Sequence, residues 1–254
     1  MAVPNPAGEV LLIPTTFSCQ KSLDEIAAKY KKLRLHGLQV DPKSFSSTYE
    51  DESQFSPATW RSRLLNPAGK TFVSVTNPDN EYDNKSGGIS SAESGSPNTS
   101  FQRLVSRDWV GIVTMLGPVQ VSKPIADKET TPVNPWDVFF RDGKYNVPRS
   151  AIEEDLKDSE VAYLVVGMFV LPEARQKGHA SQLVKGLIQA ARKDACARGV
   201  SKATISLEIE PGNATAQRLY ERLGFVVCDK ALPMVDKQGK TTYVVALIKE
   251  IDLT

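Results

Sequence analysis

The stretch FVLPEARQKGHASQLV, residues 169–184, decides the fold, because it joins a strand to a helix through a junction with little side-chain bulk. A helix N-terminus presents free backbone N–H groups and the positive end of the helix dipole, which together bind phosphate. Gly178 and Ala180 leave that backbone bare, and Arg175 and Lys177 add positive charge beside it. The junction is therefore suited to be an anion-binding site, which we call the anion seat. The alternative is an ordinary strand-to-helix turn that carries a glycine for steric reasons.

A strand–helix–strand unit is predicted around this junction. Residues 162–171 are a near-continuous apolar run, typical of a strand that is covered on both faces. Residues 181–199 have helical spacing, residues 202–209 read as a strand, and residues 213–224 as a short helix. This order implies that the two strands pair in parallel. Asn213 and Gly224 are the expected cap and stop of the last helix.

The rest of the chain adds elements on both sides of this unit. Ser22 is the expected cap of the first helix and Gly37 its stop. The charged runs KYKKLR and ARKDACAR are interpreted as solvated helix faces. The predicted strands are residues 9–17, 70–76 and 108–119 and a closing pair around the DKQG turn; the predicted helices are residues 22–37 and 56–65. Residues 77–107 are expected to be disordered, and residues 120–159 to be an insertion.

Composition and charge are those of an ordinary globular protein. The 254 residues are 41% hydrophobic and 24% charged, with a net charge of +1, so no global field recruits nucleic acid or a membrane. The start of the chain has no basic region followed by an apolar run, so no secretory signal is expected. The cysteines are odd in number and lack CxxC spacing, which argues against a disulfide framework or a zinc site. We expect a cytoplasmic protein, with nuclear access not excluded.

Two motifs resemble those of the GNAT superfamily of acetyltransferases. The pattern V-x-P-x-x-R-x-x-G-x-A resembles the acyl-CoA-binding motif of that superfamily, and it is formed by Val170, Pro172, Arg175, Gly178 and Ala180. The pattern N-x-x-A-x-x-L-Y-x-x-x-G-F resembles a second GNAT signature, and it is formed by Asn213, Ala216, Leu219, Tyr220, Gly224 and Phe225. Residues 33–64 also look like the substrate-side segment of many GNAT proteins. The chain lacks the GxGxxG and GxxxxGK[ST] fingerprints of nucleotide-binding folds.

The resemblance implies an α/β (α+β) GNAT fold for residues 1–254 as a single domain. Such a fold is a mixed, mostly antiparallel sheet of about seven strands, flanked by helices, with a central splayed parallel pair. The pantetheine of acetyl-CoA would lie in the gap between these strands, bonded to main-chain groups of Met168, Phe169, Val170 and Leu171. The residues that would surround the pyrophosphate are Arg175, Gln176, Lys177, Gly178, His179, Ala180 and Ser181, with Asn213 and Tyr220 as further contacts. His179 is expected to contribute its backbone N–H rather than its ring.

The same resemblance implies the catalytic groups. Tyr220 resembles the general acid that protonates the departing CoA thiolate, and a buried core tyrosine is the alternative. Glu208 is the first candidate base, because LEIE…N…LY resembles LEVR…N…LY of the ribosomal-protein N-terminal acetyltransferases; the alternative is a glutamate that merely faces solvent or a neighbouring strand. Glu210 and Glu52 are second candidates, and Glu52 could instead bind a substrate ammonium group. Phe45 and Tyr49 are expected to contact substrate, with simple packing as the alternative.

Three functions fit these expectations. The first is transfer of an acetyl group from acetyl-CoA to a primary amine, by direct attack in a ternary complex and without a metal. The acceptor could be a small molecule, an amino acid or a peptide. The second is a non-catalytic acyl-CoA-binding module, and the third is a protein N-terminal or lysine acetyltransferase. The expected assembly is a monomer or homodimer, with no nucleic acid and no membrane as partner.

Overall fold

The computed structural model describes residues 8–76, 97–122, 139–141, 144–145, 155–235, 239 and 241–253. The strands are β1 (Gly8–Leu12), β2 (Gly69–Thr76), β3 (Trp109–Ser122), β4 (Phe140–Arg141), β5 (Lys144–Tyr145), β6 (Glu160–Val170), β7 (Lys202–Ile209), β8 (Val226–Val235) and β9 (Thr241–Ile251). The helices are α1 (Gln20–Val40), α2 (Tyr49–Ser53), α3 (Pro57–Leu64), α4 (Pro97–Ser106), α6 (His179–Arg198) and α7 (Ala214–Arg222), with 3-10 turns η1 (Pro42–Ser44) and η3 (Pro172–Ala174).

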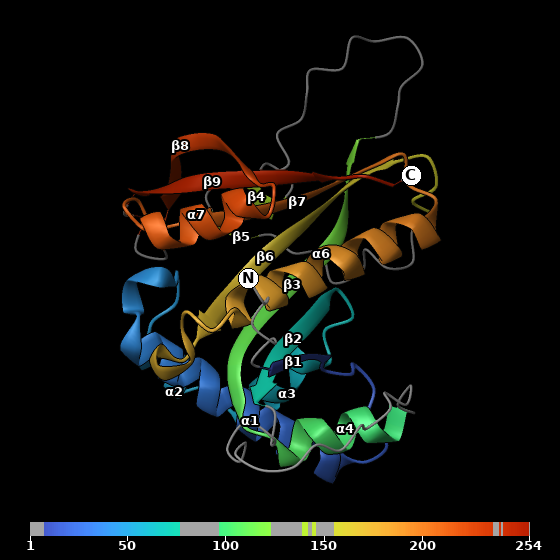
Figure 1. The fold of residues 1–254 in the computed structure, drawn as a ribbon, viewed down its shortest axis with the longest axis vertical. Coiled ribbons are helices and arrows are strands. Elements are labelled where there is room, and N and C mark those ends of the chain that lie inside the picture. Colours follow the sequence, from blue (N-terminus) through green and yellow to red (C-terminus); the bar gives the residue numbers. More distant parts are fainter. Residues whose placement is uncertain are drawn as a thin grey trace, which may run out of the picture.

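A mixed sheet forms the centre of the molecule (Figure 1). Its seven strands lie in the order β1-β2-β3-β6-β7-β9-β8, and β4 and β5 form a separate two-stranded ladder. Only β6 and β7 pair in parallel within the seven-stranded sheet, and its other neighbours are antiparallel. The predicted fold class, with a central parallel pair in a mostly antiparallel sheet, is confirmed.

Each face of the sheet is covered by its own helices. Side chains alternate between the two faces of a strand, so Val113 joins the α6 side while its neighbour Ile112 joins the α1 and α3 side. Leu183 and Leu187 of α6 are fully buried against the first face. Trp60 of α3 is buried on the second face, edge-on to Tyr30 at a ring separation of 5.8 Å. A hydrophobic core therefore packs against each face of the sheet, and a third, smaller cluster forms around Phe139.

The parallel strands pair over only part of their length. Their register runs from Glu160 opposite Lys202 to Leu164 opposite Ser206, and it ends there although both strands continue. Beyond that point β6 stays paired with β3 on its other edge, up to Val170 opposite Gly111. The two strands therefore separate in the plane of the sheet, as the expected splayed pair requires.

Gly37 has a different role from the predicted helix stop. Helix α1 runs from Gln20 to Val40, so it continues past Gly37 and begins before the expected cap, Ser22. A Cβ atom on Gly37 would lie 3.0 Å from the ring of Phe169, a distance that real Cβ atoms rarely reach. Gly37 is therefore needed for the close approach of α1 to β6, and the helix tolerates it because packing outweighs propensity.

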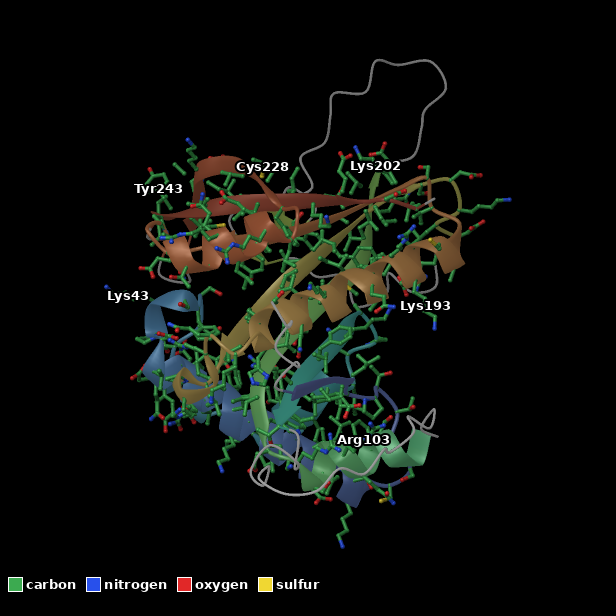
Figure 2. The ribbon with its side chains drawn as sticks, viewed as in Figure 1. Lys43, Arg103, Lys193, Lys202, Cys228 and Tyr243 are labelled. Carbon is green, nitrogen blue, oxygen red and sulfur yellow. The ribbon has the colours of Figure 1, made fainter. Side chains whose placement is uncertain are left out.

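Part of the segment that was expected to be disordered is helical. Residues 97–106 form α4, and the Lys29 ammonium donates to the carbonyl oxygens of Leu104 and Arg107 at its C-terminal end, at 3.2 and 2.7 Å. Arg103, labelled in Figure 2, pairs with Glu9 on β1 at 2.6 Å. The expectation is thus wrong for residues 97–106, and residues 77–96 lie outside the described part. Of the expected insertion, residues 120–122 extend β3, 140–141 and 144–145 form β4 and β5, and the remainder up to residue 154 is not described apart from Phe139.

The charged run in α6 is solvated only in part. Lys193 is exposed and points away from the sheet (Figure 2). Asp194, its neighbour, turns inward and accepts hydrogen bonds from the Tyr163 hydroxyl at 2.8 Å and the Lys70 ammonium at 2.6 Å. Arg198 completes this cluster at 3.0 Å. A helical run of mixed charges can therefore carry one inward ion that ties the helix to two strands.

Among the described helices, none combines the length and the apolar character that a membrane crossing requires.

Candidate active site

The separation of β6 and β7 opens onto a cavity of about 400 Å³. Residues 165–168 of β6 line one wall, and residues 207–210, at the end of β7 and just beyond it, line another. The remaining sides are lined by residues of helices α1 and α3, by residues 44–47 and by the first turns of α7. The gap between the strands and this cavity are therefore continuous, and both belong to the region where the two motifs meet.

The strand-to-helix junction has the open geometry predicted for an anion seat. Gly178 precedes α6 with φ of +87°, in the left-handed region that favours glycine, and a Cβ atom there would meet nothing within 4 Å. The first N–H groups of α6, from His179 to Ser181, have no partner within the helix. The backbone is thus bare and faces open space, so it fits a diphosphate.

The His179 side chain points away from this seat. It is 3% exposed, and its Nδ1 atom lies 2.8 Å from the Ser74 hydroxyl of β2. Burial, with a smaller effect from Lys177, lowers the pKa of His179 below its usual value, so the ring is neutral at pH 7. The imidazole is therefore part of the packing between α6 and the sheet, and the backbone role of His179 stays a prediction.

The Arg175 guanidinium is already engaged. Its Nε atom donates to the Val170 carbonyl at 3.1 Å, and its Nη2 atom forms a short ion pair with Asp41. The side chain therefore holds the loop against the end of β6 and the end of α1. Gln176 and Lys177 are exposed beside Gly178, so Lys177 is the cation of the motif that stays available to an anion.

The edge of β6 that faces the gap offers main-chain groups. The N–H of Leu171 donates to the carbonyl of Val110 on β3 at 2.9 Å. Because successive residues of a strand direct their N–H and C=O groups to opposite edges, those of Val170 face away from β3. Its carbonyl is taken by Arg175. Met168 lines the cavity, whereas the Phe169 side chain packs in the core near Gly37.

Tyr220 lies on α7 and reaches the cavity from within the core. Its side chain is 4% exposed and contacts the Phe225 ring edge-on at 5.5 Å. Burial raises the pKa of the Tyr220 phenol above its usual value, so the group keeps its proton at neutral pH. A protonated phenol that lines the gap is suited to give a proton to a thiolate.

The candidate carboxylates Glu208 and Glu210 line the same cavity. Both are half-buried, Glu208 on β7 opposite Ala246 of β9 and Glu210 just beyond the strand. Asn213 caps α7, because its Oδ1 atom accepts from the Ala216 N–H at 3.0 Å, and it also lines the cavity. The cap was predicted from sequence and is confirmed.

Glu52 is occupied by two arginines, which argues against its predicted roles as base or ammonium ligand. It is 1% exposed and accepts from Arg34 Nη2 and Nε at 2.8 and 3.1 Å and from Arg63 Nη1 at 2.8 Å. Burial by itself raises the pKa of Glu52, but the hydrogen bonds from the two guanidinium groups outweigh it and lower the pKa to about 2. A carboxylate held in this way is a poor proton acceptor and has little left to offer an ammonium group.

The predicted aromatic contacts differ in position. Phe45 lines the cavity, and the Arg34 guanidinium carbon stacks 4.5 Å from the centre of its ring. Tyr49 begins α2 and is not among the residues that line the cavity.

Arg63 and Arg34 are cavity residues that the sequence interpretation missed, and Arg34 lies in the KYKKLR run, which was read as a solvated face. The Arg34 side chain is 12% exposed and points into the cavity. Helical spacing contains the signal: Arg34 follows the buried Tyr30 by one turn and precedes the buried Leu38 by another.

No group of three metal-ligating side chains occurs within the residues that the structure describes.

Comparisons with known proteins agree with this geometry. Residues 146–225 match the model of the acetyltransferase (GNAT) family. No curated protein matches the chain in sequence. The structure of Arabidopsis thaliana NAA60 in complex with acetyl-CoA is similar with a TM-score of 0.51 and 13% identity, over 96% of this chain and 99% of that one. A GNAT-family acetyltransferase from Streptococcus pneumoniae has a TM-score of 0.48 and 15% identity, over 96% and 100%. The family match covers β6, α6, β7 and α7, and this part of the chain, with its separated parallel strands, therefore resembles a GNAT acetyltransferase domain.

Proposed function

We propose that this protein transfers an acetyl group from acetyl-CoA to a primary amine. The observation that carries the proposal is the end of the β6–β7 pairing at Leu164 and Ser206, beside a cavity that contains both Tyr220 and Glu208. The NAA60 structure of the same fold was solved with acetyl-CoA, which supports this cosubstrate. The open seat at Gly178 fits the diphosphate of CoA, and the gap-facing edge of β6 fits its pantetheine arm.

The residues of the cavity divide the chemistry between them. The amine nitrogen attacks the thioester carbonyl carbon, and the carbon–sulfur bond breaks to release CoA. Glu208 takes the proton that the amine loses, and Tyr220 gives its proton to the departing sulfur. In this proposal the N–H of Val170, which faces the gap, donates to the oxygen that gains negative charge. Catalysis needs no covalent enzyme intermediate, because the amine can attack directly.

A binding module that retains acetyl-CoA without turnover is the main competing function. It would use the seat at Gly178 but would not need a protonated phenol in the cavity. The presence of Tyr220 at that position therefore favours the enzyme.

Cys19, Cys196 and Cys228 are free and exposed, which supports a reducing compartment such as the cytoplasm.

The test measures release of free CoA thiol from acetyl-CoA with a broad panel of primary amines. The proposal predicts amine-dependent release that falls by about 100-fold in Tyr220→Phe. Tight binding of CoA without release against any amine would instead establish the binding module.

A further inference from the structure

The cavity carries charges of opposite sign on two of its walls. Arg34 from α1 and Arg63 from α3 line one side, and Glu208 and Glu210 at the end of β7 line another. Figure 1 shows that α1 and β7 lie on opposite sides of β6. A ligand in this cavity therefore meets guanidinium groups at one end and carboxylates at the other.

The arginine end keeps a net positive charge. Glu52 is the carboxylate that pairs with Arg34 and Arg63, so two cations share one anion. A guanidinium has five N–H donors, and Glu52 uses only Nε and Nη2 of Arg34 and Nη1 of Arg63. Nη1 of Arg34 has no hydrogen-bond partner among the described residues. It lies 3.5 Å from where a Cβ atom on Gly167 would stand, so it faces the part of β6 that lines the gap.

The guanidinium groups are held in place before any ligand arrives. Arg34 stacks on Phe45 at 4.5 Å, and Arg63 stacks on Phe55 at 4.8 Å. Glu52 fixes the other edge of both groups. A rigid, half-buried guanidinium with free donors binds a carboxylate at little further entropic cost.

We propose, resting on the function proposed above, that the acceptor is an amine that also carries a carboxylate, as in an amino acid. Arg34, assisted by Arg63, binds the carboxylate, and the amine lies at the Glu208 end beside the thioester. An acceptor with a second cation in place of the carboxylate would place like charges together in a half-buried site, which is unfavourable. Arg34 is thus a specificity-determining residue, and Glu52 is the residue that positions it.

The experiment compares three amines that share one side chain: L-phenylalanine, L-phenylalaninamide and phenethylamine. We expect kcat/KM for the amino acid to exceed that for the amide by about 10- to 100-fold, the range for a hydrogen bond to a charged group. The amine of the amide is less basic, so a larger fraction of it is the reactive free base at neutral pH. This difference by itself favours the amide, so a higher kcat/KM for the amino acid cannot result from it. The same ranking is expected for alanine and alaninamide.

Three variants separate binding of the carboxylate from a structural role. Arg34→Gln lowers the ratio of acid to amide toward one, and Glu52→Gln lowers it as well, because Arg34 loses the residue that holds it in position. Arg61→Gln is the matched control: Arg61 lies on α3 but pairs with the exposed Asp24, and its ratio is unchanged. The ratio of kcat/KM for the acid to kcat/KM for the amide, measured on one protein sample, does not depend on the fraction of folded protein, because that fraction affects both values equally. A purely structural role would shift both substrates alike and leave the ratio constant in every variant.

Calorimetric titration of the acid and the amide into protein saturated with CoA decides the inference without turnover. Preferred binding of the acid that is lost in Arg34→Gln supports it, even if no amine is acetylated and the proposed function fails. Amides that bind and react as well as the acids, or better, overturn the inference and leave the acetyltransferase function in place.

Discussion

The effect of Glu52→Gln on the folding free energy can be calculated directly from the structure. Glu52 is almost fully buried, and its hydrogen bonds to Arg34 and Arg63 lower its pKa from 4.5 to about 2. One pKa unit corresponds to about 1.4 kcal/mol, so this shift is worth about 3 kcal/mol of folding free energy. The folded-state pKa is the lower one, so the contribution is complete above pH 4.5 and is lost as the pH falls toward 2. Glutamine removes the charge and leaves two half-buried guanidinium groups without their anion.

The assay is denaturant unfolding of the wild type and Glu52→Gln at pH 7 and at steps down to pH 3. We expect the variant to be less stable by about 3 kcal/mol at pH 7, with a difference that shrinks below pH 4.5, because the carboxyl of the unfolded wild type takes up a proton there while the folded carboxyl stays ionised down to about pH 2. Asp24→Asn serves as the control, because Asp24 pairs with Arg61 at the exposed surface and should change stability little. Equal stability of wild type and Glu52→Gln at pH 7, or a difference that is the same at pH 7 and pH 3, would refute this reasoning.

Three further substitutions test other parts of the site. Tyr220→Phe should lower kcat by about 100-fold without lowering the melting temperature, and unchanged kcat in steady-state assays would remove Tyr220 as the acid. Because burial raises the pKa of this phenol, its loss of a proton should cause no fall in the wild-type kcat below about pH 10. Gly178→Val, at φ of +87°, should weaken CoA binding by more than about 10-fold in calorimetry while circular dichroism stays native; unaltered affinity would move the diphosphate elsewhere. Gly37→Ala should cost about 1 to 3 kcal/mol of unfolding free energy because its Cβ would press on Phe169, whereas Gly186→Ala in α6 should be tolerated; equal melting curves for both would contradict the packing argument.

Local patterns in the sequence were sufficient for the elements that position the site. Asn213 was recognised as a cap from its place before a short amphipathic helix, and the separated strands were implied by the resemblance of the motif around Gly178 to that of the GNAT superfamily. Both depend on residues that are neighbours in the chain or repeat with a regular period. The order and type of the elements from β6 to β9 were predictable for this reason.

Residues whose role depends on distant partners were not predictable in the same way. Gly37 has the sequence context of a helix stop, but its role is set by Phe169, which reaches it from β6. Glu52 was placed in the cavity by the motif resemblance, yet its carboxylate forms ion pairs with Arg34 and Arg63, which come from two different helices. No local signal records that three side chains from three segments will meet. The same is true of Asp194, whose partners lie on β2 and β6 as well as on its own helix.

The central claim is that CoA lies in the gap where β6 leaves β7, bonded to the free edge of β6. Residue-resolved amide hydrogen exchange with and without CoA tests it most directly, and Val170 and Leu171 supply a matched pair. The Leu171 N–H already donates to Val110, so its protection should not change, whereas the gap-facing N–H of Val170 should exchange more slowly once CoA binds. Bound CoA with unchanged exchange at Val170 would contradict the account.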